Sequence, residues 1–271
     1  MYKQNLHTHT CFCDGRNTPE DMIKEALDKG FDSIGFSGHA YTEHDTSWCM
    51  PHELTPKYYA ECRMLSERYR GKIDVYTGIE QDLFSEKPEL PYDFIIGSVH
   101  YLRPSADAAV DESPDVLRCA ADKYFAGDMM RLVREYYSLM VELPERTGCD
   151  IIGHFDLITK FIERDPTLFD ADGEEYLDIA LCAAKELAEK QVIFEINSGA
   201  VSRGYRTSPY PSRTLLSEMA KMGAKITFSS DSHAKWSLDF GYEDMQRLAV
   251  ECGFEYIYVM KYGAFVREKI V

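Results

Sequence analysis

The chain contains eight histidines, and six of them lie at the ends of short apolar runs that resemble β-strands. His7 and His9 are separated by one residue, and Asp231 and His233 repeat that spacing near the other end of the chain. Because side chains alternate across a strand, residues two apart point to the same side. Each pair can therefore hold one metal ion between its two side chains.

Other imidazoles and carboxylates follow further apolar runs. They are Asp14 in CFCDG, His39 in IGFSGH, Glu80 in VYTGIE, His100 in FIIGSVH and His154 in IIGHFD. Imidazole and carboxylate together suit zinc, iron or manganese better than magnesium or calcium. With the two pairs above, these positions exceed what one ion takes. We therefore expect two to three divalent ions, with a carboxylate such as Glu80 bridging two of them.

Basic residues near two of these runs are candidates for binding a phosphate. Arg203 follows EINSG, and its guanidinium suits two-pronged binding of a phosphate group. The alternative, which the sequence favours equally, is that Arg203 is an exposed surface residue without a role in binding. Lys160 and Arg164, just beyond the fifth apolar run, are further candidates for the same role. Asn197 either faces the site or stabilises the turn that follows it.

The acidic segment 40–55 carries two histidines and two large aromatic residues. We assign no metal role to His44 or His52. They either contact the substrate or lie in a solvated loop. Trp48 and Tyr41 can stack on a flat substrate ring. Alternatively, these two side chains are hydrophobic anchors of the loop.

The elements that must position these side chains alternate along the chain. The pattern predicts strands over 3–9, 33–37, 74–80, 93–100, 150–154, 192–197, 225–230 and 254–260. Helices are expected from the Thr18 cap to Gly30 and over 55–70, 122–143, 174–190, 212–222 and 242–252. Residues 101–121 are expected to form a long loop, which in compact domains often has a functional role.

This α/β alternation is typical of a TIM-like barrel, in which the strand ends share the face that holds the active site. A doubly wound open sheet is the alternative, but no G-x-G-x-x-G follows the first strand. No repeat or linker divides the chain, so we expect one domain over 1–271.

Acidic residues outnumber basic ones by 46 to 30, for a net charge of -16. Such a surface repels nucleic acid. No stretch approaches the roughly 20 apolar residues of a membrane-spanning helix, and MYKQNLHTHT lacks the apolar core of a secretory signal. The irregularly spaced cysteines indicate reduced thiols. We therefore expect a soluble cytoplasmic protein that binds neither nucleic acid nor a membrane.

Seven motifs occur in order over nearly the whole chain: HTHTCFCDG, FSGHA, GIEQD, GSVHYL, IIGHFDLI, EINSG and SSDSH. As a set they resemble the polymerase-and-histidinol-phosphatase (PHP) superfamily. The opening motif, GSVHYL, the chain length and the lack of an added domain resemble its monofunctional histidinol-phosphate phosphatases. The resemblance implies a distorted (β/α)7 barrel with a trinuclear metal centre. One of the eight expected strands then lies outside the barrel, and the last is the candidate.

The resemblance also implies a distribution of nine ligands over three ions. The first ion would take His7, His9, Glu80 and Asp231; the second Glu80, His100 and His154; and the third Asp14, His39 and His233. Many superfamily members have a histidine where this chain has Asp14.

The activity implied is hydrolysis of L-histidinol phosphate to L-histidinol and phosphate, in histidine biosynthesis, by attack of a metal-bridging hydroxide. Asp231, His233 and Arg203 are the catalytic candidates: Arg203 would neutralise phosphoryl charge, and Asp231 or a metal-held water would protonate the leaving oxygen. One alternative is a phosphoesterase acting on a nucleotide, a nucleic-acid end or a phosphotyrosine protein. Another is a metal-loaded domain without activity.

Overall fold

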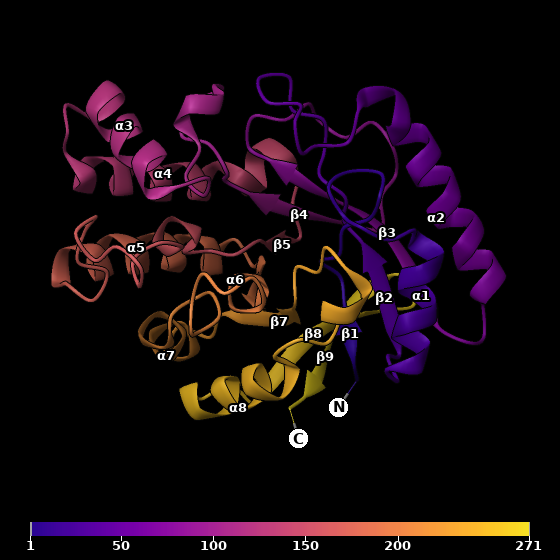
Figure 1. The fold of residues 1–271 in the computed structure, drawn as a ribbon. Coiled ribbons are helices and arrows are strands. Elements are labelled where there is room, and N and C mark those ends of the chain that lie inside the picture. The colour runs from indigo at the N-terminus through magenta and orange to yellow at the C-terminus, as the bar shows by residue number, and fades with distance from the viewer. Residues whose placement is uncertain (1, 271) are drawn as a thin grey trace.

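The computed structural model describes residues 2–270, in which seven parallel strands form a barrel surrounded by helices (Figure 1). Each strand pairs with the next one along the chain. The strands are β1 (Gln4–Asn5), β2 (Ser33–Phe36), β3 (Asp74–Asp82), β4 (Phe94–Ser98), β5 (Ile151–Ile152), β6 (Ile193–Asn197) and β7 (Lys225–Ser229). The predicted TIM-like barrel is confirmed.

The barrel closes between the segments that follow β1 and β7. Thr8 forms a parallel bridge with Ser232, in which the His9 amide donates to the Ser232 carbonyl at 2.8 Å and the Ser232 amide donates to the His7 carbonyl at 3.2 Å. Barrel closure therefore brings together the two segments that carry the paired ligand candidates.

Six helices lie close to their predicted ranges and pack around the barrel (Figure 1). They are α1 (Pro19–Asp28), α2 (Thr55–Tyr69), α4 (Met129–Thr147), α5 (Glu174–Glu189), α7 (Arg213–Lys221) and α8 (Tyr242–Cys252). The Thr18 hydroxyl accepts from the Asp21 amide at 3.2 Å, so the predicted cap of α1 is confirmed.

The expected loop over 101–121 is wrong in its second half. A short 3-10 helix (Ala106–Ala108) is followed by α3 (Pro114–Phe125), which Ser113 caps by accepting from the Val116 amide. Ser-Pro-Asp is a helix start signal, and the buried positions 117, 120 and 121 have helical spacing. The sequence prediction merged the end of α3 with α4, although left-handed residues at 126 and 127 separate the two helices.

A hairpin of β8 (Tyr256–Lys261) and β9 (Ala264–Lys269) lies outside the seven-stranded sheet. The expectation that the last predicted strand leaves the barrel is thus confirmed, whereas β9 was not predicted. The Gln4 side-chain amide donates to the Met260 carbonyl at 2.9 Å, and its oxygen accepts from the Met260 amide at 2.8 Å. These bonds fasten the hairpin to β1 (Figure 1).

The barrel interior changes from apolar to polar along its strands. The Phe94 ring fills the lower part so tightly that a Cβ on Gly78 would lie 2.4 Å from it. Because inward positions recur every two residues, β3 presents Tyr76, Gly78 and then Glu80. The apolar plug consists of Leu6, Tyr76, Phe94, Ile96, Ile151, Ile193 and Met260. The polar cluster therefore lies toward the carboxyl ends of the strands.

No helix within residues 2–270 is long and apolar enough to cross a membrane. The cysteines are all free, as the irregular spacing indicated.

Candidate metal centre

Glu80, at the end of β3, lies at the centre of a cluster of imidazoles. It is 1% exposed, and Ser98 donates to its Oε1 at 2.6 Å. Five ring nitrogens lie around its two oxygens: His39 Nδ1 at 2.8 Å, His7 Nε2 at 3.1 Å and His9 Nε2 at 3.5 Å from Oε2, and His154 Nε2 at 3.1 Å and His100 Nε2 at 3.5 Å from Oε1. This carboxylate has the position of a bridging ligand.

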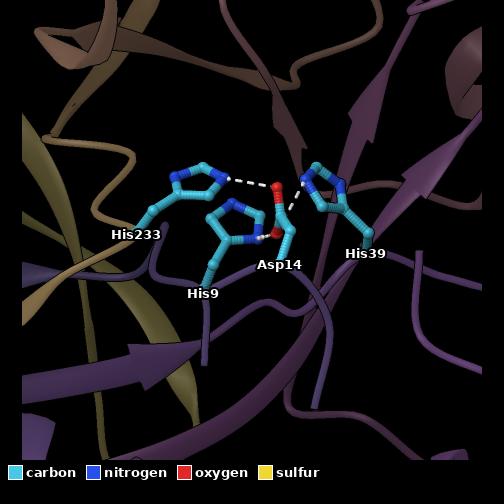
Figure 2. A group of neighbouring side chains, drawn as sticks. All are labelled: His9, Asp14, His39 and His233. Atoms are coloured by element: carbon cyan, nitrogen blue, oxygen red, sulfur yellow. Dashed lines mark ion pairs between the residues drawn. The ribbon is translucent and has the colours of Figure 1, made fainter. Parts of the chain in front are cut away.

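A second group lies nearer the solvent and contains His9, Asp14, His39 and His233 (Figure 2). Asp14 Oδ2 lies 3.1 Å from His233 Nε2, and Asp14 Oδ1 lies 3.7 Å from His39 Nε2. His9 faces both groups, because its Nδ1 lies 3.8 Å from Asp14 and its Nε2 faces Glu80. Asp14 and His233 are the most exposed members, with side chains 31% and 25% exposed.

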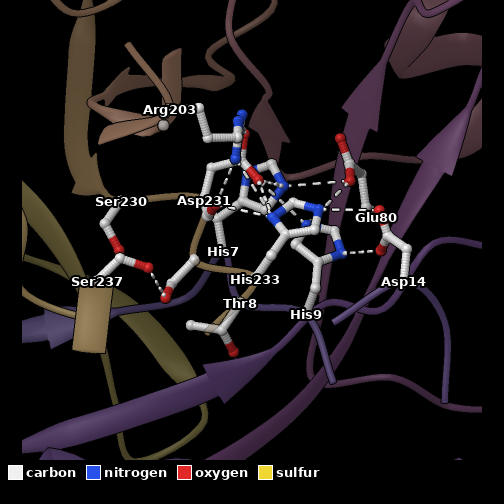
Figure 3. A network of polar contacts seen from close by, with 12 residues as sticks. His7, Thr8, His9, Asp14, Glu80, Arg203, Ser230, Asp231, His233 and Ser237 are labelled. Carbon is white, nitrogen blue, oxygen red and sulfur yellow. Dashed lines mark hydrogen bonds and ion pairs between the residues drawn. The ribbon is translucent and has the colours of Figure 1, made fainter. Parts of the chain in front are cut away.

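Asp231 lies between the cluster and Arg203 (Figure 3). Its Oδ1 is 3.3 Å from His9 Nε2, and its Oδ2 accepts from Arg203 Nη2 at 2.9 Å. Arg203 Nη1 also donates to the Asp231 carbonyl at 3.0 Å. Gly199 lies against this pair, and a Cβ there would lie 2.7 Å from Asp231 Oδ2 and 2.8 Å from Arg203 Nη2. The guanidinium is therefore fixed beside the cluster.

The structure brings all nine predicted ligand residues together. Three groups have ligand atoms within 4.8 Å of one another: His9, Asp14, His39 and His233; His7, His9 and Glu80; and His39, Glu80 and His100. His154 joins through Glu80 and lies beside His100, with ring centroids 5.1 Å apart. The groups share His9, His39 and Glu80, so the cluster is continuous.

Several buried atoms of this cluster make no hydrogen bond within the described chain. They include His7 Nε2, His9 Nε2, His39 Nδ1 and Glu80 Oε2, which face one another. An unsatisfied buried polar atom costs about 1–3 kcal/mol. Electron-pair donors that converge on one point are the donor set of a metal site, and the His and carboxylate composition suits divalent ions.

The carboxylates of the site are held in the charged form that a metal ligand needs. Burial would raise the pKa of Glu80, but the imidazoles of His7 and His39 hold it well below its usual range. Burial would likewise raise the pKa of Asp231, but Arg203 and His7 hold it well below its usual range. Burial and the neighbouring His233 and His39 lower the pKa of His9 to about 3, which keeps it in the neutral form that a metal ligand requires.

Glu195, on β6, is a functional residue that the sequence reasoning missed. It is 1% exposed and accepts from His7 Nδ1 at 2.9 Å. Its carboxylate also accepts from the His154 amide, the Asn197 side chain and the Ser229 hydroxyl, each at 2.7 Å. The strand period was the available signal, because Ile193, Glu195 and Asn197 share one face and an inward carboxylate needs partners. Asn197 therefore supports Glu195, and its Oδ1 accepts from the Gly199 amide at 2.8 Å, which is the turn-stabilising role given as the alternative.

A cavity of about 500 Å³ lies above the cluster. Trp48 forms part of its wall, with the indole 4.4 Å from the His39 ring. The indole N–H donates to the Tyr101 hydroxyl at 2.6 Å, and this hydroxyl donates to Asp45 at 2.7 Å. Tyr41 lines a different hollow beside His52. Of the two aromatic candidates, the structure thus brings only Trp48 to the site.

The basic candidates are divided in the same way. Arg203 and Lys160 line the cavity, and Lys160 pairs with Asp111 at 3.1 Å. Arg164 instead donates to the Gly204 carbonyl, outside the cavity lining. His44 packs against Tyr101 with ring centroids 4.6 Å apart, and His52 is exposed, so neither belongs to the cluster.

The fold and this site together define a β/α barrel with a His- and carboxylate-rich centre at the carboxyl ends of its strands. The profile of the PHP domain matches residues 5–199, and the chain belongs to that family, as its motifs indicated.

Curated relatives extend over nearly the whole chain. A probable histidinol-phosphatase of Deinococcus radiodurans is 30% identical and covers 88% of this chain and 89% of its own length. The histidinol-phosphatase of Bacillus subtilis is 27% identical, with coverages of 90% and 98%. A solved histidinol phosphate phosphatase of Lactococcus lactis, complexed with zinc, L-histidinol and phosphate, has a TM-score of 0.73 at 20% identity and covers 98% of this chain and 99% of its own. This last similarity concerns the fold.

Proposed function

We propose that this chain is a metal-dependent phosphomonoesterase that hydrolyses L-histidinol phosphate to L-histidinol and phosphate. The observation that carries the proposal is a cavity with converging imidazole and carboxylate donors on its floor and the guanidinium of Arg203 beside them. The names of the relatives over almost the whole chain, and the ligands of the Lactococcus lactis structure, support this substrate.

The cofactors are proposed to be two to three divalent ions of zinc, iron or manganese. The proposed ligands are His7, His9, Asp14, His39, Glu80, His100, His154, Asp231 and His233. When bound, such ions lower the pKa of coordinated water and neutralise phosphate charge.

The chain's own side chains have separate proposed tasks. Glu80 keeps its negative charge at the centre, and Glu195 orients the imidazole of His7. Arg203, fixed by Asp231, binds non-bridging phosphoryl oxygens. Proton transfer to the leaving oxygen is assigned to His233, whose Nδ1 lies 3.5 Å from Oδ1 of the ionised Asp231.

The test is a comparison of kcat/KM for L-histidinol phosphate, AMP, phosphoserine and a phosphotyrosine peptide, with the zinc- or manganese-loaded protein. We expect L-histidinol phosphate to be preferred by at least about 100-fold, because its ring and ammonium group both add contacts. A higher value for AMP or the phosphotyrosine peptide would favour the alternative substrates, and inactivity toward all four would contradict the enzyme class.

We also propose that residues 1–271 act as one PHP-type domain in the cytoplasm. The bonds between Gln4 and Met260, which join the first strand to the C-terminal hairpin, support a single folding unit. Calorimetry of the metal-free protein should give one unfolding transition, and two separate transitions would contradict this proposal.

A further inference from the structure

Tyr210 has a buried hydroxyl without a hydrogen-bond partner in the described chain. The residue is 1% exposed and lines the cavity above the cluster. A buried hydroxyl usually has a partner, because leaving it unsatisfied costs stability. At this place in the cavity wall, the missing partner can be a bound molecule.

The surrounding structure holds Tyr210 in place from two sides. Its amide donates to the Asn197 carbonyl at 2.9 Å and its carbonyl accepts from the Asn197 amide at 2.8 Å, which ties it to the end of β6. The Arg206 guanidinium lies over the ring at 4.7 Å, and the ring of His154 lies 6.5 Å away. The phenol is therefore positioned by contacts that do not use its hydroxyl.

Two cations and two acids surround this hydroxyl, and both acids pair with basic side chains, so the phenol remains a free hydrogen-bond donor. Arg206 and Arg203 are the cations that act on it, and Asp156 and Asp111 are the acids. A phenol keeps its proton at neutral pH, so the hydroxyl can donate. Asp156 and Arg206 pair with each other at 3.9 Å, and Asp111 pairs with Lys160. Arg203, which pairs with Asp231, also lines the cavity beside the cluster.

We propose that the Tyr210 hydroxyl donates a hydrogen bond to a non-bridging oxygen of the bound phosphoryl group, on the same side as Arg203. This inference rests on the proposed phosphatase function and adds a catalytic residue to it. Trp48 lies against His39 and His100, whereas Tyr210 lies against His154, so the two residues contact different parts of the cluster. The substrate's ring would then lie toward Trp48 and its phosphate toward Tyr210.

The test compares Tyr210→Phe with the wild-type protein, both loaded with zinc. We expect kcat/KM for L-histidinol phosphate to fall about 10- to 100-fold, as for loss of a hydrogen bond to a charged group. The dissociation constant of inorganic phosphate, measured by calorimetry, should rise about 10-fold, with unchanged metal content. The Tm without phosphate should stay the same or rise, because no bond within the chain is lost.

Tyr136→Phe is the matched control. Its hydroxyl is also buried but donates to the Phe155 carbonyl at 3.2 Å, away from the cavity. This variant should have a lower Tm than the wild-type protein and should bind phosphate with wild-type affinity. Unchanged phosphate binding in Tyr210→Phe, or a loss of Tm like that of the control, would overturn the inference. If wild type does not hydrolyse L-histidinol phosphate but Tyr210→Phe still weakens phosphate binding, the proposed function fails and the Tyr210 contact stands.

Discussion

The imidazole of His7 lies between two buried carboxylates: Nδ1 is 2.9 Å from Glu195 and Nε2 is 3.1 Å from Glu80. With Nδ1 bonded to Glu195, Nε2 is the ring nitrogen that faces the cluster. Carboxylates that orient a ligand histidine in this way make the imidazole a better donor. We therefore expect metal affinity to depend on a residue outside the proposed ligand set.

Glu195→Gln should weaken metal binding about 10- to 100-fold. The partners of Glu195 are N–H and O–H groups that donate to it, and the N–H of the new side-chain amide would point at one of these donors. Zinc content after dialysis against a zinc buffer, measured by mass spectrometry, checks this. Glu175→Gln, an exposed glutamate that pairs with Arg134, is the control and should keep full metal content. Wild-type zinc affinity in Glu195→Gln would show that His7 needs no such support.

Removal of the ions should abolish activity and lower stability together. The buried carboxylates and imidazoles then lose their partner, and a ligand at about 100 times its dissociation constant stabilises the folded state by about 2.7 kcal/mol. We expect chelator-treated protein to melt about 5–10 °C lower. Calorimetry and activity assays before and after adding zinc or manganese check this, and full activity in metal-free protein would refute the proposed mechanism.

Gly199→Ala should damage the site without changing its charge. The added methyl group would meet Asp231 and Arg203 at less than 3 Å, so the ion pair must move. A displacement of about 1 Å in a catalytic group can reduce the rate 100-fold, and we expect kcat/KM to fall about 10- to 100-fold. Val201→Ala, on the same short helix α6 (Gly199–Ser202), should have little effect. Equal activity of both variants and wild type would mean that the position of Arg203 does not matter.

Trp48→Ala should raise KM for L-histidinol phosphate about 10-fold, because the indole in the cavity wall would no longer contact the ring of the substrate. A phosphomonoester without a ring, such as phosphoserine, should be affected less than about twofold. Tyr41→Ala is the control, since Tyr41 lies outside the cavity. Equal losses for both substrates would assign Trp48 to loop packing instead of ring recognition.

Much of this molecule could be predicted from local patterns. The α/β alternation indicated the barrel, and a period of two placed His7 and His9 on one side. The helix signals at Thr18 and Thr55 marked real starts. These features depend on backbone sterics and on which side chains avoid water, so they are present in the sequence itself.

Other features depended on contacts between distant segments. Closure of the barrel through Thr8 and Ser232 brought residues from 7 to 233 into one cluster, and no spacing indicates that His9 would be shared between two ligand groups. The contacts of Glu195 with His7 and of Asp231 with Arg203 join residues far apart in the chain. The sequence determined which donors are present and at which strand ends they lie. Tertiary packing decided which donors face one another. Their positions depend on strand register, on the space that Gly199 leaves open and on the space that the Phe94 ring fills.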